Sequence, residues 1–163
     1  DLCVTGNSYG VVGVDFNKGF VSVSEIDRYG NLINNFNIDY QYSKGNQTKN
    51  DFQCIATRLK DYCLNKGKDL VIEKLNFTKK KDNLISKRGK KYNEMLSSLA
   101  YSKFDSIMTS KCAKNRIFLH KVNPAWTSWI AKQKYCPKMK LNIHSGASYV
   151  IARRGMLLKD KVK

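Results

Sequence analysis

The sequence lacks the features that mark exported or membrane-spanning chains. It has neither the apolar stretch of a signal peptide nor an uninterrupted apolar run of about 18 residues, the length that indicates a membrane-spanning helix. Its five cysteines are odd in number and include no C-x-x-C pair, which argues against a disulfide framework. We therefore expect an intracellular protein in a reducing compartment.

Acidic residues are also scarce. The 163 residues include 13 aspartates and glutamates against 30 lysines and arginines, which gives a net charge of +17. This charge exceeds what solubility needs and predicts a positive surface potential, for which nucleic acid is the natural partner. An anionic membrane surface is the alternative, but the sequence has no basic amphipathic helix with bulky aromatic residues on its apolar side.

The length suits one domain, so we expect residues 1–163 to fold around a single sheet-based core. The first residue is Asp1 rather than Met, which is compatible with a fragment of a longer protein. Short apolar or alternating stretches predict strands over residues 10–15, 20–26, 36–42, 70–73 and 117–122. Apolar residues at helical spacing predict helices from about residue 50 to 64, 92 to 114 and 144 to 154.

The order of these elements predicts the fold class. Three strands, a helix, a strand, a helix, a strand and a final helix are typical of the RNase H-like α/β fold, a mixed five-stranded sheet flanked by helices. The competing doubly wound fold would open with a glycine-rich turn from strand to helix. Here the first strand leads through a turn at residues 17–19 into a hairpin, which favours the RNase H-like arrangement.

Two acids follow the apolar parts of two predicted strands. Asp15 and Glu73 end strands that lie parallel and adjacent in this topology, so we expect both carboxylates at one edge of the sheet. Neighbouring carboxylates repel each other, and Mg²⁺ or Mn²⁺ bound between them would relieve the repulsion. Two such ions could hydrolyse a phosphodiester. The alternative is that each acid ends its strand facing solvent, and the matched positions of the two favour a metal site.

The candidate third metal ligand is a histidine rather than an acid. The last predicted helix opens with His144, which shares a helical face with Ala147, Ser148 and Ile151 and would therefore point toward the two acids. A neutral imidazole can ligate a metal or transfer a proton. The alternative is a histidine that only packs in the first turn of the helix.

Basic residues gather directly after Glu73, beside the predicted site. They would neutralise phosphates and position a substrate without reading its sequence, although a run of lysines can also be a solvated loop. Two arginines add charge on the predicted exposed side of the last helix. The predicted nucleic-acid-binding residues are Lys79, Lys80, Lys81, Lys87, Arg88, Lys90, Lys91, Arg153 and Arg154.

The remaining aromatic and acidic residues have weaker interpretations. Trp126 and Trp129 could stack on bases, but packing against the edge of the sheet is the favoured reading. We expect Asp105 to be solvated on its helix and Asp160 to lie in a frayed tail.

Four stretches of the chain resemble one known family. They are GVDFNKG (residues 13–19), LVIEKLNF (70–77), VNPAWTS (122–128) and ASYVIARRG (147–155), and together they are similar to the RuvC-like nuclease portion of the transposon-associated TnpB (OrfB) proteins, long labelled transposases. The resemblance spans nearly all of this chain but only the C-terminal part of a full family member. A full member also has an N-terminal region that grips guide RNA and target DNA.

The resemblance implies an RNA-guided, Mg²⁺- or Mn²⁺-dependent DNA endonuclease that takes part in transposition and DNA recombination. Asp15 would be the first metal-binding acid and Glu73 the second. The partners would be DNA and a guide RNA. The protein would lie in the cytoplasm of a prokaryotic cell and with the nucleoid when bound to DNA.

Two positions depart from the family pattern. Family members usually carry a zinc ribbon of two C-x-x-C pairs, whereas residues 129–143 here contain only Cys136, so we predict a subgroup without zinc. The third catalytic acid of the family falls at His144, and RuvC resolvases use a histidine on their last helix. Two alternatives therefore stay open: a nuclease-inactive derivative that binds nucleic acid and regulates by occupancy, and a generic RNase H or integrase-type enzyme.

Overall fold

The computed structural model describes residues 9–41, 46–74 and 88–161, with the backbone alone described at residues 46–47 and 88–98. Its centre is a five-stranded sheet in the order β3-β2-β1-β4-β5. β1 pairs antiparallel with β2, β2 antiparallel with β3, and both β1–β4 and β4–β5 are parallel. The strands are β1 (Val11–Asn17), β2 (Phe20–Ile26), β3 (Leu32–Asp39), β4 (Asp69–Glu73) and β5 (Leu119–Val122). This sheet confirms the predicted fold class.

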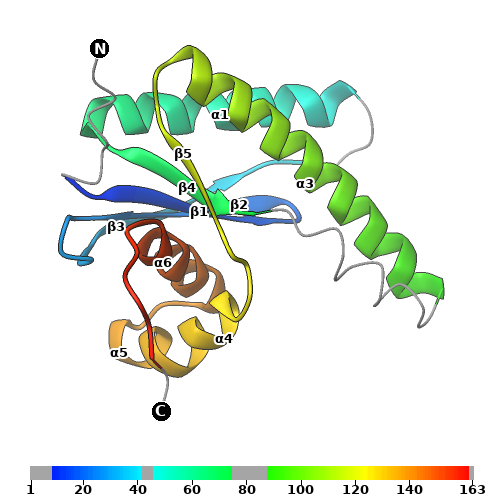
Figure 1. The fold of residues 1–163 in the computed structure, drawn as a ribbon. Coiled ribbons are helices and arrows are strands. Elements are labelled where there is room, and N and C mark those ends of the chain that lie inside the picture. The colour runs from blue at the N-terminus through cyan, green and yellow to red at the C-terminus, as the bar shows by residue number, and fades with distance from the viewer. Residues whose placement is uncertain (1–8, 42–45, 75–87, 162–163) are drawn as a thin grey trace.

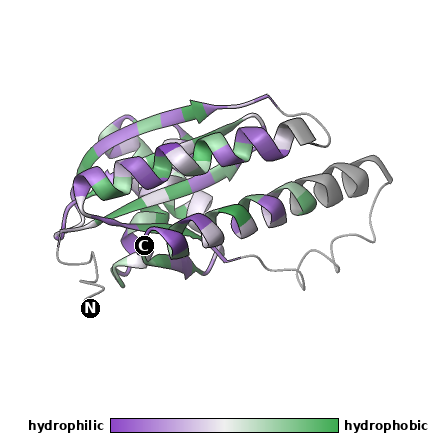
Figure 2. Ribbon diagram, turned by 90° about the horizontal axis from the view of Figure 1, so that it is seen from above, coloured by the Kyte–Doolittle hydropathy of each residue, from purple (hydrophilic) through white to green (hydrophobic). Residues whose placement is uncertain are grey.

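Helices cover both faces of the sheet (Figure 1). α1 (Asn46–Lys66) and α3 (Arg88–Lys114) lie side by side over one face, as Figure 2 shows from above. α6 (Ile143–Gly155) packs against the other face. Among the described residues, no helix is both long and apolar enough to cross a membrane.

Alternation along the strands divides the core into two parts. Val12 and Val14 of β1 pack in the cluster under α1 and α3, whereas Val11 packs with α6. In β4, Leu70 and Ile72 belong to the first cluster and Val71 to the second. Because side chains point to opposite faces at successive positions, the odd-numbered positions of both strands face α6.

The close approach of α6 to β1 depends on Gly13. A Cβ at this position would lie 2.5 Å from the Ser148 carbonyl oxygen and 2.6 Å from the Ala152 amide nitrogen. Both atoms belong to the α6 backbone, so they could not move without displacing the helix. Gly13 therefore sets how near the middle of α6 comes to β1.

The segment between β5 and α6 was not predicted. It forms α4 (Thr127–Ile130), η2 (Ala131–Tyr135) and α5 (Cys136–Met139), which pack beside α6 below the sheet (Figure 1). These turns are too short to show a periodic apolar stripe in the sequence. The third strand also begins earlier than predicted, at Leu32 rather than Phe36.

Two predictions about the end of the chain were wrong. The Asp160 side chain, predicted in a frayed tail, is 2% exposed and accepts hydrogen bonds from Lys134, Tyr135 and Arg153. The Arg153 side chain, predicted on the exposed side of α6, is 17% exposed because it pairs with Asp160 at 3.0 Å. Arg153 therefore fastens the tail to α6.

Candidate active site

The parallel pairing of β1 with β4 places Asp15 level with Glu73. In this pairing Val11 lies opposite Asp69 and Gly13 opposite Val71, so the positions two residues further along are Asp15 and Glu73. Both are odd-numbered positions, which face α6; Glu73 is the last residue of β4, and Asp15 lies two residues before the end of β1. The structure thus places the two acids at the same edge and on the same face of the sheet.

Asp15 is a largely buried carboxylate with two polar neighbours. Its side chain is 12% exposed. Asn17 donates from Nδ2 to Asp15 Oδ2 at 3.0 Å, and His144 Nδ1 lies 3.4 Å from the same oxygen. Burial raises the pKa of Asp15 above its ordinary value of 3.8, while the hydrogen bond from Asn17 and the nearby His144 partly oppose the rise. A bound cation would therefore stabilise the ionised form of this carboxyl.

His144 reaches Asp15 from the first turn of α6. The turn is fixed by the N-cap residue Asn142, whose side chain accepts a hydrogen bond from the Ser145 amide at 2.8 Å. The imidazole also meets the Phe20 ring edge to face, with centroids 5.0 Å apart. Its side chain is 45% exposed, so it contacts both the buried carboxylate and solvent.

Glu73 is held by two residues that the sequence did not identify. Thr127 donates from Oγ1 to Glu73 Oε1 at 2.8 Å, and the Tyr101 hydroxyl donates to the Glu73 carbonyl oxygen. Burial and then the negative charges of Glu73, Asp105 and Asp15 raise the pKa of Tyr101, which keeps its hydroxyl protonated. Thr127 stands in the VNPAWTS stretch, so its place in that motif was the only signal for its role.

The donor atoms at this edge fit a hard divalent cation. Asp15 and Glu73 supply the carboxylate oxygens that Mg²⁺ and Mn²⁺ prefer, and His144 adds an imidazole nitrogen beside Asp15. Within the described part of the chain, however, no three histidine, cysteine, aspartate or glutamate side chains already form a metal-binding cluster. The two carboxylates would hold the ion, and water would complete its coordination.

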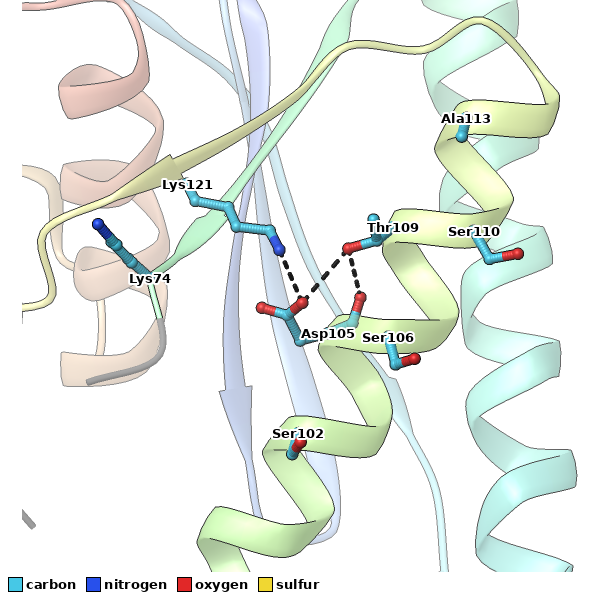
Figure 3. Close-up of a pocket in the computed structure, with 8 residues that line it drawn as sticks. All are labelled: Lys74, Ser102, Asp105, Ser106, Thr109, Ser110, Ala113 and Lys121. Atoms are coloured by element: carbon cyan, nitrogen blue, oxygen red, sulfur yellow. Dashed lines mark hydrogen bonds and ion pairs between the residues drawn. The ribbon is translucent and has the colours of Figure 1, made fainter. Parts of the chain in front are cut away.

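A hollow of about 610 Å³ lies between α3 and β5 and begins at Lys74, the residue after Glu73 (Figure 3). The prediction of a solvated Asp105 was wrong, since its side chain is 16% exposed and pairs with Lys121 at 2.8 Å. Thr109 donates to the Asp105 carbonyl oxygen at 2.8 Å. The hollow is lined by Lys74, Ser102, Asp105, Ser106, Thr109, Ser110, Ala113 and Lys121.

Most of the predicted nucleic-acid-binding residues cannot be placed in the site. Lys79–Lys81 and Lys87 lie outside the described residues, and Arg88, Lys90 and Lys91 lie in α3 where only the backbone is described. Arg154 is placed: it donates from Nη1 to the Asn123 carbonyl oxygen at 2.5 Å, just after β5.

The pKa of Asp15 leads to a stability prediction. A carboxyl with a raised pKa in the folded chain destabilises the fold as the pH rises above 3.8, its ordinary value. Asp15→Asn should therefore unfold at higher urea than the wild type at neutral pH without metal, and this difference should vanish in acid. Mn²⁺ at about 100 times its dissociation constant should stabilise the wild type by about 2.7 kcal/mol and the variant far less. If Mn²⁺ stabilised the wild type and Asp15→Asn equally, the proposed metal site at Asp15 would be contradicted.

Comparison with known proteins bears on the fold. No protein-family model and no curated protein sequence matches the chain. Among solved structures, the chain is similar to T. thermophilus RuvC in complex with Holliday junction substrate, with a TM-score of 0.60. The match covers 88% of this chain and 90% of that chain at 9% sequence identity. The chain therefore has the RNase H-like fold in its RuvC-like form.

Proposed function

We propose that this chain is a metal-dependent nuclease domain that hydrolyses phosphodiester bonds in DNA. The observation that carries the proposal is the parallel β1–β4 register, in which Gly13 lies opposite Val71, so that Asp15 and Glu73, two residues further along each strand, are directed to one edge and face of the sheet. His144 supports it, because its imidazole lies 3.4 Å from Asp15 and is partly open to solvent. Divalent cations held by carboxylate oxygens can act on phosphodiesters, and this is the chemistry that the two acids would support.

Each residue of the site would have a different role in catalysis. A divalent cation bound by Asp15 and Glu73 would polarise the phosphodiester and lower the pKa of an attacking water. Asn17 and Thr127 fix the orientation of the two carboxylates by donating hydrogen bonds to them. His144 can accept a proton from the water or return one to the leaving oxygen, since its ring faces both Asp15 and solvent.

The net charge of the chain and its structural similarity to RuvC support DNA as the substrate. The net charge of +17 favours a polyanion, and the RuvC structure that the chain resembles contains a DNA junction. The four motif stretches extend the proposal to a transposon-encoded, RNA-guided protein of the TnpB type without a zinc ribbon. In that case the further partners are a guide RNA and its target DNA, and the protein acts in the cytoplasm and at the nucleoid of a prokaryotic cell.

A nuclease-inactive regulator is the second candidate. The observation that favours it is the position of His144, where the TnpB family has its third acid, together with the absence of a three-residue metal cluster among the described residues. Such a protein would bind nucleic acid without cutting it. A generic RNase H or integrase-type enzyme has the same fold and is separated by its substrate, because it would prefer an RNA–DNA hybrid or a transposon end.

Replacement of the paired acids tests the nuclease proposal. Asp15→Asn and Glu73→Gln should each lower Mn²⁺-dependent cleavage of labelled DNA by more than about a hundredfold, because a metal ligand contributes more than the outer partners worth about 10–100-fold. Asp61→Asn, at an exposed acid of α1, should leave cleavage unchanged. Circular dichroism checks that each variant folds. Cleavage that survives in Asp15→Asn would overturn the proposal, and DNA binding without cleavage by the wild type would favour the inactive regulator.

Thr127 should behave as a positioning residue for Glu73. Thr127→Val keeps the shape of the side chain but removes the donor to Glu73 Oε1, and we expect a loss of about 10–100-fold in cleavage with a weaker dependence on Mn²⁺. Thr127→Ser keeps the hydroxyl and should retain most of the activity. Metal titrations of the cleavage rate separate the two variants. A loss in Thr127→Ser as large as that in Thr127→Val would contradict this role, because the serine keeps the donor to Glu73.

A further inference from the structure

Both tryptophans of the chain are exposed. The sequence favoured packing against the sheet edge, but Trp126 is 70% exposed and Trp129 is 48% exposed, so that prediction was wrong. Their rings meet edge to face with centroids 5.8 Å apart. Together with Ile130 and Asp160 they line a hollow of about 400 Å³, which we call the tryptophan groove. Exposed apolar side chains that gather in one place mark an interaction surface more often than scattered single residues do.

The lining of the groove suits an apolar side chain. Three of its four residues are tryptophan or isoleucine, and the side chain of the fourth, Asp160, is 2% exposed because it pairs with Lys134 and Arg153. A bulky apolar side chain can fill such a hollow without leaving a polar group unpaired. A nucleobase would instead place its polar edges against indole and aliphatic surfaces, where unpaired donors and acceptors cost free energy.

Contacts on two sides hold the groove in shape. On one side, Trp126 has a φ of 68°, in the left-handed region that bulky residues rarely adopt. Arg154 donates to the Asn123 carbonyl oxygen at 2.5 Å and so fastens the loop before this tryptophan. On the other side, Arg153 holds Asp160 at 3.0 Å. A groove that is already formed loses less conformational entropy when a ligand enters it.

Positive charge surrounds the groove. Residues 106–159 include lysines and arginines but no aspartate or glutamate. Exposed lysines stand next to the lining residues along the chain: Lys132 comes three residues after Trp129, and Lys159 and Lys161 lie on either side of Asp160. A partner that inserts an apolar side chain would therefore meet cations beside it, and acidic residues would complement these cations.

We propose that the tryptophan groove docks an acidic segment of a partner protein, with one bulky apolar side chain in the groove and flanking aspartates or glutamates beside the lysines. A second copy of this chain does not fit, because both copies would carry a net charge of +17. Nucleic acid and an anionic bilayer supply negative charge, but neither inserts a single apolar side chain into a concave groove. The proposal is independent of the nuclease function, since it involves no metal and no cleavage.

Tryptophan fluorescence follows the docking, because both tryptophans of the chain line the groove. The wild-type chain is titrated, in metal-free buffer, with a short tryptophan-free peptide in which aspartates and glutamates flank one phenylalanine and one leucine. Docking should move the emission to shorter wavelength, since the indole rings leave water. The same peptide with serines in place of phenylalanine and leucine keeps its charge and should bind at least about tenfold more weakly, because buried apolar anchors supply most of the affinity.

Three variants separate the groove from the general charge of the chain. In anisotropy titrations with the labelled peptide, Trp126→Ala should weaken binding about tenfold. Lys132→Glu should weaken it and reduce its dependence on salt. Lys49→Glu makes the same change of charge in α1, on the opposite face of the sheet, and should have a much smaller effect. Circular dichroism checks that each variant folds.

Four outcomes would overturn the proposal. They are a serine peptide that binds as tightly as the original, unchanged affinity in Trp126→Ala, equal losses in Lys132→Glu and Lys49→Glu, and a spectral change that follows self-association of the chain. Oligothymidylate and phosphatidylserine vesicles are titrated in parallel. A larger shift of the tryptophan emission with either of them than with the peptide would assign the groove to nucleic acid or to a membrane instead.

Discussion

The parallel pairing of β1 with β4 is the constraint on which the rest of the site depends. Gly13 opposite Val71 makes Asp15 and Glu73 level, and the strand alternation turns both toward α6. A slip of one residue would turn one carboxylate to the opposite face, under α1 and α3, among apolar side chains. The buried valines of β1 prevent that slip because each face of the strand has its own core cluster.

The surroundings of the two acids follow from this pairing. Bringing two negative charges to one edge and burying one of them is unfavourable. Polar neighbours offset part of this cost: Asn17 and His144 lie beside the Asp15 carboxylate, and Thr127 donates a hydrogen bond to Glu73. Gly13 allows α6 to come close enough for His144 to take part. A site with two carboxylates, few other ligands and an open side is suited to a cation that also binds substrate oxygens.

The sequence predicted the strands, the fold class and the positions of Asp15, Glu73 and His144, but not the side-chain contacts that hold Glu73 and the end of the chain. Apolar runs before Asp15 and Glu73 indicated two buried strands, and the hairpin after Asp15 separated the RNase H-like fold from a doubly wound one. Thr127 and Tyr101 could not be found this way, since their partner Glu73 lies 54 and 28 positions away. For the same reason Asp160 looked like part of a loose tail, although three residues on other turns bind it.

The fold and the paired acids together describe an edge of the sheet that could hold a cation and a substrate phosphate. The cation is the element that links them. The most direct measurement is anomalous diffraction from crystals of the chain grown with Mn²⁺. The account predicts an anomalous peak bound by carboxylate oxygens of both Asp15 and Glu73, on the α6 face of the sheet. A structure at saturating Mn²⁺ with no ion between these two side chains would contradict it.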